Sequence, residues 1–221
     1  MAHNLEIINN EASMFYYGDT PWHKLGKQVN RPLTAAEALT EAKLEYTVIG
    51  NPVFCNKRFG NTMMLTAIPN VKANVREDTQ DVIGIVSDRY KIIQNKECFS
   101  YLDPIVGEYG AVYHTAGVLG RGERIWIMAK LPESVKVGDD VIDQHLVITN
   151  SHDGTDSFKV YFTPIRVVCE NTLNASIEGA KKCYSIKHIG NTIKKMDEIR
   201  DIMFSNNKYI KGLTTKLERF M

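Results

Sequence analysis

The chain has 221 residues, of which 43% are hydrophobic and 24% charged, and its net charge is +1. This composition is typical of a folded globular protein and excludes a low-complexity or disordered chain. No window reaches the roughly 18 apolar residues of a membrane span, and the N-terminus lacks a signal-peptide pattern. We therefore expect a cytoplasmic protein without a membrane partner.

The charges are distributed unevenly along the chain. Residues 157–221 contain 12 Lys/Arg and 6 Asp/Glu, whereas residues 1–156 contain 15 and 20. A basic final third is a mild indication of a polyanionic partner, although such segments are often only solvated. The four cysteines are widely spaced and include no C-x-x-C pair, which favours neither a zinc site nor a disulfide framework.

The first half of the chain predicts an arm, a helix and a meander. Residues 1–33 show little periodicity and predict an extended N-terminal arm. Thr34 and Glu37 have capping-box spacing, so a helix should begin there and end near Leu44. Strands are then expected at residues 45–57, 62–68 and 80–93, as an antiparallel meander.

The second half predicts a further helix and two pairs of strands. Asn95 is a plausible N-cap for a helix that Pro104 breaks or kinks. Strands follow at residues 110–119 and 124–131. The runs 139–149 and 157–169 flank a short Asp-Gly connection, which is typical of a β-hairpin. Leu173 and Ile177 indicate a helix directly after Cys169, and residues 192–221 predict a last helical region.

Helices that surround runs of consecutive strands, instead of alternating with them, predict the α+β class. We expect an antiparallel sheet, built from the meander and the long hairpin and packed with helices. Three segments follow from this interpretation: an N-terminal arm (1–33), an α+β core domain (34–190) and a C-terminal helical extension (191–221).

The stretch "TNSHDGTDS", residues 149–157, contains the residue types of a hydrolytic triad. Ser151, His152 and Asp153 cannot form one, because adjacent side chains diverge while the mechanism needs a hydrogen-bonded relay. Metal binding by His152, Asp153 and Asp156 would need a further ligand. We favour a turn, and expect His152 to help position a partner at the hairpin tip. His23, in "TPWHKLG", is interpreted as part of an apolar anchor.

Other catalytic signatures are missing from the sequence. It contains no G-x-x-x-x-G-K-[ST] and no H-E-x-x-H, and no cofactor or metal is predicted. Asp139, Asp140 and Asp143 could bind Mg²⁺ in a nuclease, although an acidic run beside a strand is more often a solvated edge.

Two predicted strands carry cations and aromatic residues on one face. Arg124, Trp126 and Lys130 alternate with aliphatic residues, and Lys159 shares a face with Tyr161. Cations interleaved with aromatics suit single-stranded nucleic acid, because bases stack on the rings. Alternatively, the rings are half-buried cross-strand partners. The candidate contacts are Arg124, Trp126, Lys130, Lys159, Tyr161, Arg166, Lys181 and Lys182.

Four stretches together carry a family resemblance: "TPWHKLG" (20–26), "VSDRYKIIQN" (86–95), "TNSHDG" (149–154) and "TPIRVVCENTLN" (163–174). Over residues 1–190 the chain resembles phage and plasmid proteins catalogued as a domain of unknown function (DUF932), a resemblance that implies no activity. More remotely, it resembles the Rad52-like and phage Red-beta single-strand annealing proteins. That likeness implies a curved antiparallel sheet, a ring-shaped homo-oligomer and ATP-independent binding in a basic groove.

The leading functional expectation is a phage- or plasmid-encoded protein that binds and anneals single-stranded DNA in recombination or replication, in the cytoplasm of a bacterial host cell. One alternative is a protein-interaction module of a mobile element that acts on a host factor, which predicts a large apolar patch. The other alternative is a metal-dependent nuclease.

Overall fold

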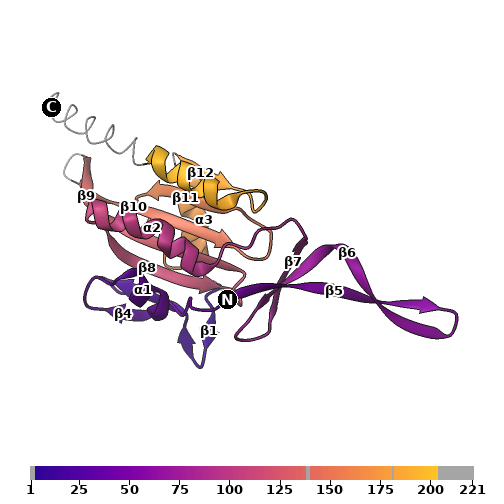
Figure 1. The fold of residues 1–221 in the computed structure, drawn as a ribbon. Helices are drawn as coiled ribbons and strands as arrows, with labels where there is room; N and C mark the ends of the chain where they lie inside the picture. Colours follow the sequence, from indigo (N-terminus) through magenta and orange to yellow (C-terminus); the bar gives the residue numbers. More distant parts are fainter. Residues whose placement is uncertain (1–2, 138–139, 181, 204–221) are drawn as a thin grey trace.

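The computed structural model describes residues 3–137, 140–180 and 182–203 (Figure 1). The protein has an α+β fold with a central seven-stranded sheet and a separate three-stranded sheet that projects from it. The named helices are α1 (Ala35–Glu41), α2 (Asn95–Tyr109) and α3 (Glu170–Glu178). Residues 192–203 are also helical, and the rest of the predicted C-terminal helix, 204–221, lies outside the described residues.

The central sheet has the strand order β12-β11-β10-β9-β8-β3-β4. Its pairs are antiparallel except for β3 and β4, which are parallel. The strands are β3 (Met14–Tyr17), β4 (Lys27–Val29), β8 (Val112–Leu119), β9 (Arg124–Val137), β10 (Asp140–Ser151), β11 (Phe158–Thr163) and β12 (Cys183–Ile186). A small sheet of β1 (Ile7–Ile8) and β2 (Glu11–Ala12) precedes them.

The N-terminal residues differ from the extended arm expected from the sequence, since β3 and β4 form one edge of the central sheet. Phe15 points to one face of the sheet, while Met14 and Tyr16 point to the other, and all three are buried. A strand buried on both faces has no polar alternation, which explains why periodicity missed it.

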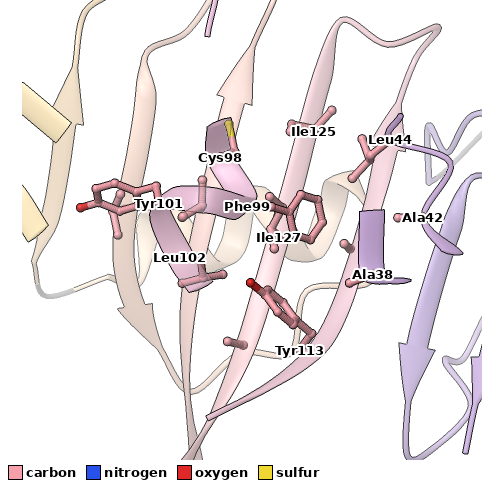
Figure 2. Close-up of a cluster of buried hydrophobic side chains, with 14 of the residues drawn as sticks. Ala38, Ala42, Leu44, Cys98, Phe99, Tyr101, Leu102, Tyr113, Ile125 and Ile127 are labelled. Carbon is pink, nitrogen blue, oxygen red and sulfur yellow. The ribbon is translucent and has the colours of Figure 1, made fainter. Parts of the chain in front are cut away.

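One face of the sheet packs against α1, α2 and residues 192–203. Cys98, Phe99 and Leu102 of α2 lie over Ile125 and Ile127 of β9 (Figure 2). The predicted capping box of α1 is present, with Thr34 and Glu37 in reciprocal hydrogen bonds. In α2 the N-cap is Gln94, one residue before the predicted Asn95, and the helix continues past Pro104.

The opposite face of the sheet is also covered. Trp126 and Met128 of β9 and Tyr161 of β11 are buried in a second cluster with Leu173 of α3 and Val167 of the preceding segment. N-terminal residues, Leu5 among them, complete this cluster. Both faces of the central strands are therefore inside the protein.

The second sheet contains the predicted meander, β5 (Val48–Phe59), β6 (Thr62–Arg76) and β7 (Val82–Ser87), in antiparallel pairs. This corrects the expectation of one sheet built from the meander and the hairpin, since β10 and β11 belong to the central sheet. Strand β7 pairs only with residues 71–75 of β6, so β5 and β6 continue beyond it as two strands. We call residues 54–68 the projecting ribbon, because they extend away from the body of the molecule (Figure 1). None of the described helices combines the length and apolar character needed to cross a membrane.

Candidate nucleic-acid interface

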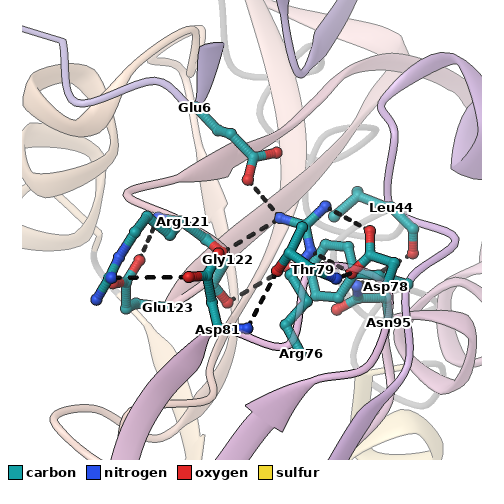
Figure 3. A network of polar contacts seen from close by, with 11 residues as sticks. Glu6, Leu44, Arg76, Asp78, Thr79, Asp81, Asn95, Arg121, Gly122 and Glu123 are labelled. Atoms are coloured by element: carbon teal, nitrogen blue, oxygen red, sulfur yellow. Dashed lines mark hydrogen bonds and ion pairs between the residues drawn. The ribbon is translucent and has the colours of Figure 1, made fainter. Parts of the chain in front are cut away.

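The base of the projecting ribbon is fixed to the body through Arg76, the last residue of β6. Arg76 is 2% exposed and forms ion pairs with Glu6 and with Asp78, the latter at 2.8 Å (Figure 3). Its guanidinium also donates to the carbonyl of Arg121 at 3.2 Å and lies 3.9 Å from the ring centroid of Tyr46. These contacts hold the end of β6, and with it the second sheet that carries the ribbon, against the body of the protein.

The "TNSHDGTDS" turn packs against this attachment. The ring Nε2 of His152 lies 2.9 Å from Asn95 Oδ1, and the His152 carbonyl accepts from Asn74 Nδ2 at 2.6 Å. Burial lowers the pKa of His152 to about 3. A Cβ on Gly84 would lie 2.4 Å from Asp153 Cα, so β7 and the turn are in close contact.

These contacts correct the expectation that His152 positions a partner at an exposed tip. His152 is fully buried, and Asp153 accepts from Ser151 Oγ and, at 2.9 Å, from the Thr155 N–H. The stretch is a turn, as the sequence favoured, and it joins the central sheet to the base of the ribbon.

His23 and Tyr90, which belong to two other sequence motifs, also form contacts within the protein. The Nδ1 of His23 accepts from the Leu25 N–H at 3.0 Å, so its Nε2 carries the proton and donates to the Val168 carbonyl at 3.0 Å. The segment is therefore held by hydrogen bonds of His23 and by the partly buried Leu25, whereas Trp22, which was expected to contribute to an apolar anchor, is 63% exposed. Tyr90, in "VSDRYKIIQN", stacks on His188 with ring centroids 4.5 Å apart.

Trp126 and Tyr161, two predicted contacts, are fully buried. The Trp126 indole donates to Thr115 Oγ1 at 3.1 Å, and the Tyr161 hydroxyl lies 2.7 Å from Ser176 Oγ on α3. Burial raises the pKa of Tyr161. This placement corrects the expectation of an exposed aromatic strand face, because α3 and the N-terminal residues cover it.

The predicted strand cations have acidic neighbours. Arg124 and Lys159 both form ion pairs with Asp156, at 3.6 and 2.6 Å. Lys130 pairs with Asp143 at 2.5 Å. The strands thus present little uncompensated positive charge.

The three remaining candidates have different surroundings. Arg166 is half-buried, and its Nη2 donates to the Tyr17 carbonyl at 3.2 Å. Lys182 is exposed, while Lys181 lies outside the described residues. The structure brings Arg166 to the same face of the sheet as Lys130.

The projecting ribbon is a surface that the sequence analysis did not single out. Its large hydrophobic side chains are 37% to 69% exposed: Phe54, Phe59, Met63, Met64, Leu65 and Ile68. It contains the cations Lys57 and Arg58, neither of which forms an ion pair among the described residues. The sequence has no acidic residue between Glu45 and Glu77, a signal that could have identified the ribbon.

The pairing register of β5 and β6 divides these side chains between two faces. Arg58 lies opposite Met63, and Lys57 lies opposite Met64. Directly opposed residues share a face, and neighbours along a strand do not. Each face therefore carries one cation and one methionine, with Phe54 on the Arg58 face. Phe59 is on the Lys57 face, and Lys57 Nζ lies 5.2 Å from its ring centroid.

The described residues contain no cluster of three His, Cys, Asp or Glu side chains that could hold a metal ion. Of the carboxylates proposed for a nuclease, Asp139 lies outside the described residues, and Asp143 accepts from Lys130 and Ser134. A cavity of about 350 Å³ lies elsewhere, between α2 and residues 192–203, with Lys91, Glu97 and Arg200 in its lining.

Comparison with known proteins identifies a family and nothing closer. The profile described as "Domain of unknown function (DUF932)" matches residues 82–221, which include three of the four motifs but not "TPWHKLG". A search of curated proteins finds no match. A search of solved structures finds none either. Because the profile spans more than half of the chain, the protein belongs to the family described as domain of unknown function (DUF932).

Proposed function

We propose that the protein is a phage- or plasmid-encoded DNA-binding protein that holds single strands and anneals them without ATP, and that the projecting ribbon is its main contact surface. The observation that carries this proposal is the composition of the ribbon. Lys57 and Arg58, which form no ion pair with the residues that the structure describes, lie beside exposed Phe54 and Phe59 in a stretch without any acidic residue.

The chemistry of the ribbon suits a DNA strand. Cations that lack an acidic partner are available to neutralise phosphates, and binding then releases counterions. An exposed phenylalanine on each face offers a ring on which a base can stack, which is worth about 1–3 kcal/mol per base.

The strand cations are secondary contacts in this proposal. Arg124, Lys130 and Lys159 would each have to exchange a carboxylate for a phosphate, which lowers the net gain. Lys182 is already exposed and needs no such exchange. The proposal further includes a curved sheet, a ring-shaped homo-oligomer and a location in the cytoplasm of a bacterial host cell.

Binding of the full chain to a fluorescent oligothymidylate, followed by anisotropy at increasing salt, tests the proposal. We expect the logarithm of the affinity to fall by about 0.7 per log unit of salt for each phosphate neutralised. Two complementary strands should anneal faster with the protein and without ATP. Absence of binding at low salt, or binding that salt does not affect, contradicts the proposal.

The second candidate is a protein-interaction module, favoured by the apolar side chains of the same ribbon. Met63, Met64 and Leu65 are all more than half exposed, with Met63 and Leu65 on one face of the ribbon and Met64 on the other. Exposed apolar surface of this kind commonly marks protein interfaces. This function predicts that a host protein is retained on the immobilised chain after nuclease treatment, and that Leu65→Ser abolishes its retention. DNA-dependent retention favours the first candidate.

A further inference from the structure

A row of basic side chains lies near the end of β11, on the face of the central sheet that carries Trp126 and Tyr161, which we call the second face. His145 of β10 lies opposite Lys130 of β9 and opposite Thr163 of β11. His114, at the bulge of β8, stacks on His145 with ring centroids 5.3 Å apart and planes within 3° of parallel. Arg166 lies three residues after the end of β11. We call His114, Lys130, His145 and Arg166 the histidine cluster.

Several ring and guanidinium nitrogens of this cluster are buried without a hydrogen-bond partner among the described residues. His114 and His145 are 8% and 3% exposed. Four buried nitrogens make no hydrogen bond of good geometry with the described residues: Nδ1 of both imidazoles, Nε2 of His145 and Nε of Arg166. The backbone of Thr163 lies close enough to the His145 ring to raise its pKa, so one of the two His145 nitrogens has a neighbouring acceptor of poor geometry. Buried polar groups are normally hydrogen-bonded, and a neutral imidazole has one donor and one acceptor nitrogen. Up to three of these four nitrogens are therefore donors, which suits a ligand with several acceptor oxygens.

The surroundings of His114 and His145 keep both imidazoles in the neutral form. Burial, with smaller contributions from the charges of Arg166, the second imidazole and Lys130, lowers the pKa of His114 to about 3. Burial also lowers the pKa of His145 to about 4, against the opposing effect of Asp143. At neutral pH the cluster therefore has two neutral imidazoles, each with one N–H donor, between two fixed positive charges.

The geometry points to a binding site for a phosphate group, which the two imidazoles and the side chains of Arg166 and Lys130 hold together. A tetrahedral oxyanion accepts several hydrogen bonds at once, and guanidinium groups match its geometry. Lys130 is 36% exposed along its side chain and exchanges Asp143 for the phosphate on binding. The phosphate belongs to a DNA backbone or to a small phosphorylated compound, and the inference holds whether or not the ribbon binds DNA.

Nuclear magnetic resonance of the full chain with ¹⁵N-labelled histidine tests the site. Inorganic phosphate, added at constant ionic strength, should shift the ring signals of His114 and His145 and leave those of His23 unchanged. An oligothymidylate without terminal phosphates is the second probe. Equal shifts with both probes assign the site to a DNA backbone, and shifts with inorganic phosphate alone assign it to a small compound. Unchanged histidine signals with both probes overturn the inference.

Two conservative variants separate a binding role from a structural one. Lys130→Gln should weaken phosphate binding by about tenfold, because it removes a charge-assisted hydrogen bond. Asp143→Asn should strengthen binding several-fold, because it removes the carboxylate that competes for Lys130. Lys187→Gln, at an exposed site away from the cluster, is the control and should leave the affinity unchanged. Wild-type affinity in both Lys130→Gln and Asp143→Asn contradicts the site.

Discussion

The projecting ribbon and the second face of the central sheet contain the same kinds of residues in opposite settings. On the sheet, Trp126 and Tyr161 are buried, and Lys159 pairs with Asp156. On the ribbon, Phe59 is 54% exposed and Lys57 has no acidic partner among the described residues. An alternation of cations and aromatic residues shows which side chains share one face of a strand. Whether a ligand can reach that face depends on the segments that pack over it.

The largest loss of stability should come from a substitution in the central sheet. Trp126→Ala removes a fully buried indole and its hydrogen bond to Thr115, and should lower the free energy of unfolding by about 3–5 kcal/mol. Denaturation in urea measures it. A loss below about 1 kcal/mol would show that Trp126 is less tightly packed than described.

The second largest loss of stability should come from a substitution at Arg76, which attaches the second sheet to the body. Arg76→Ala leaves Glu6 buried without its partner, and should cost about 3 kcal/mol, since breaking a buried ion pair is strongly destabilising. The matched control is Arg31→Ala, which removes an exposed ion pair with Glu37 and should have little effect. Equal losses for the two variants in the same urea experiment would contradict the fixed ribbon base.

The turn that joins the sheet to the ribbon should make stability depend on pH. His152 has a pKa of about 3 in the folded protein, below its ordinary value of 6.5. Between these values the unfolded chain binds a proton that the folded chain does not, so this contribution is complete above pH 6.5 and is lost as the pH falls. The slope should approach about 1.4 kcal/mol per pH unit.

Urea denaturation between pH 7.5 and about 5 measures this slope, with His152→Gln as the comparison. The variant is expected to be less stable at pH 7.5 but to lose less stability on acidification. Parallel pH profiles for the two proteins would show that His152 is not buried in its neutral form.

The smallest effect on stability should come from the ribbon itself. Phe59→Ser replaces an exposed side chain, so the free energy of unfolding should change by no more than about 0.5 kcal/mol. The same variant should bind oligothymidylate more weakly, because one stacking surface is lost. A large loss of stability with unchanged DNA binding would place Phe59 in a packed interface instead.

Local signals in the sequence predicted the local structure well. The capping-box spacing of Thr34 and Glu37 predicted the start of α1, and the alternation of apolar and polar residues predicted the strands of the meander. Long-range packing was not predictable in the same way, because the residues that bury Trp126 include Leu5 and Leu173, which are distant in the chain. Periodicity shows that a strand has two faces but does not show what covers them.

The same limit explains why the sequence did not indicate the ribbon as an exposed surface. The sequence predicted strands on both sides of Gly60, but local alternation cannot show that β7 pairs with only part of β6. The surface arises from that difference in strand length. The stretch without acidic residues, 46–76, was the remaining signal in the sequence.

The most direct test of the account compares the loss of two cations on the ribbon with the loss of two on the body. The ribbon variant combines Lys57→Gln with Arg58→Gln, and the body variant combines Lys96→Gln with Lys187→Gln. Both variants lose two positive charges, and all four residues are exposed. We predict that the ribbon variant binds oligothymidylate more weakly, with a salt slope smaller by about 1.4, while the body variant binds like the wild type. Wild-type binding by the ribbon variant, together with weaker binding by the body variant, would contradict the account.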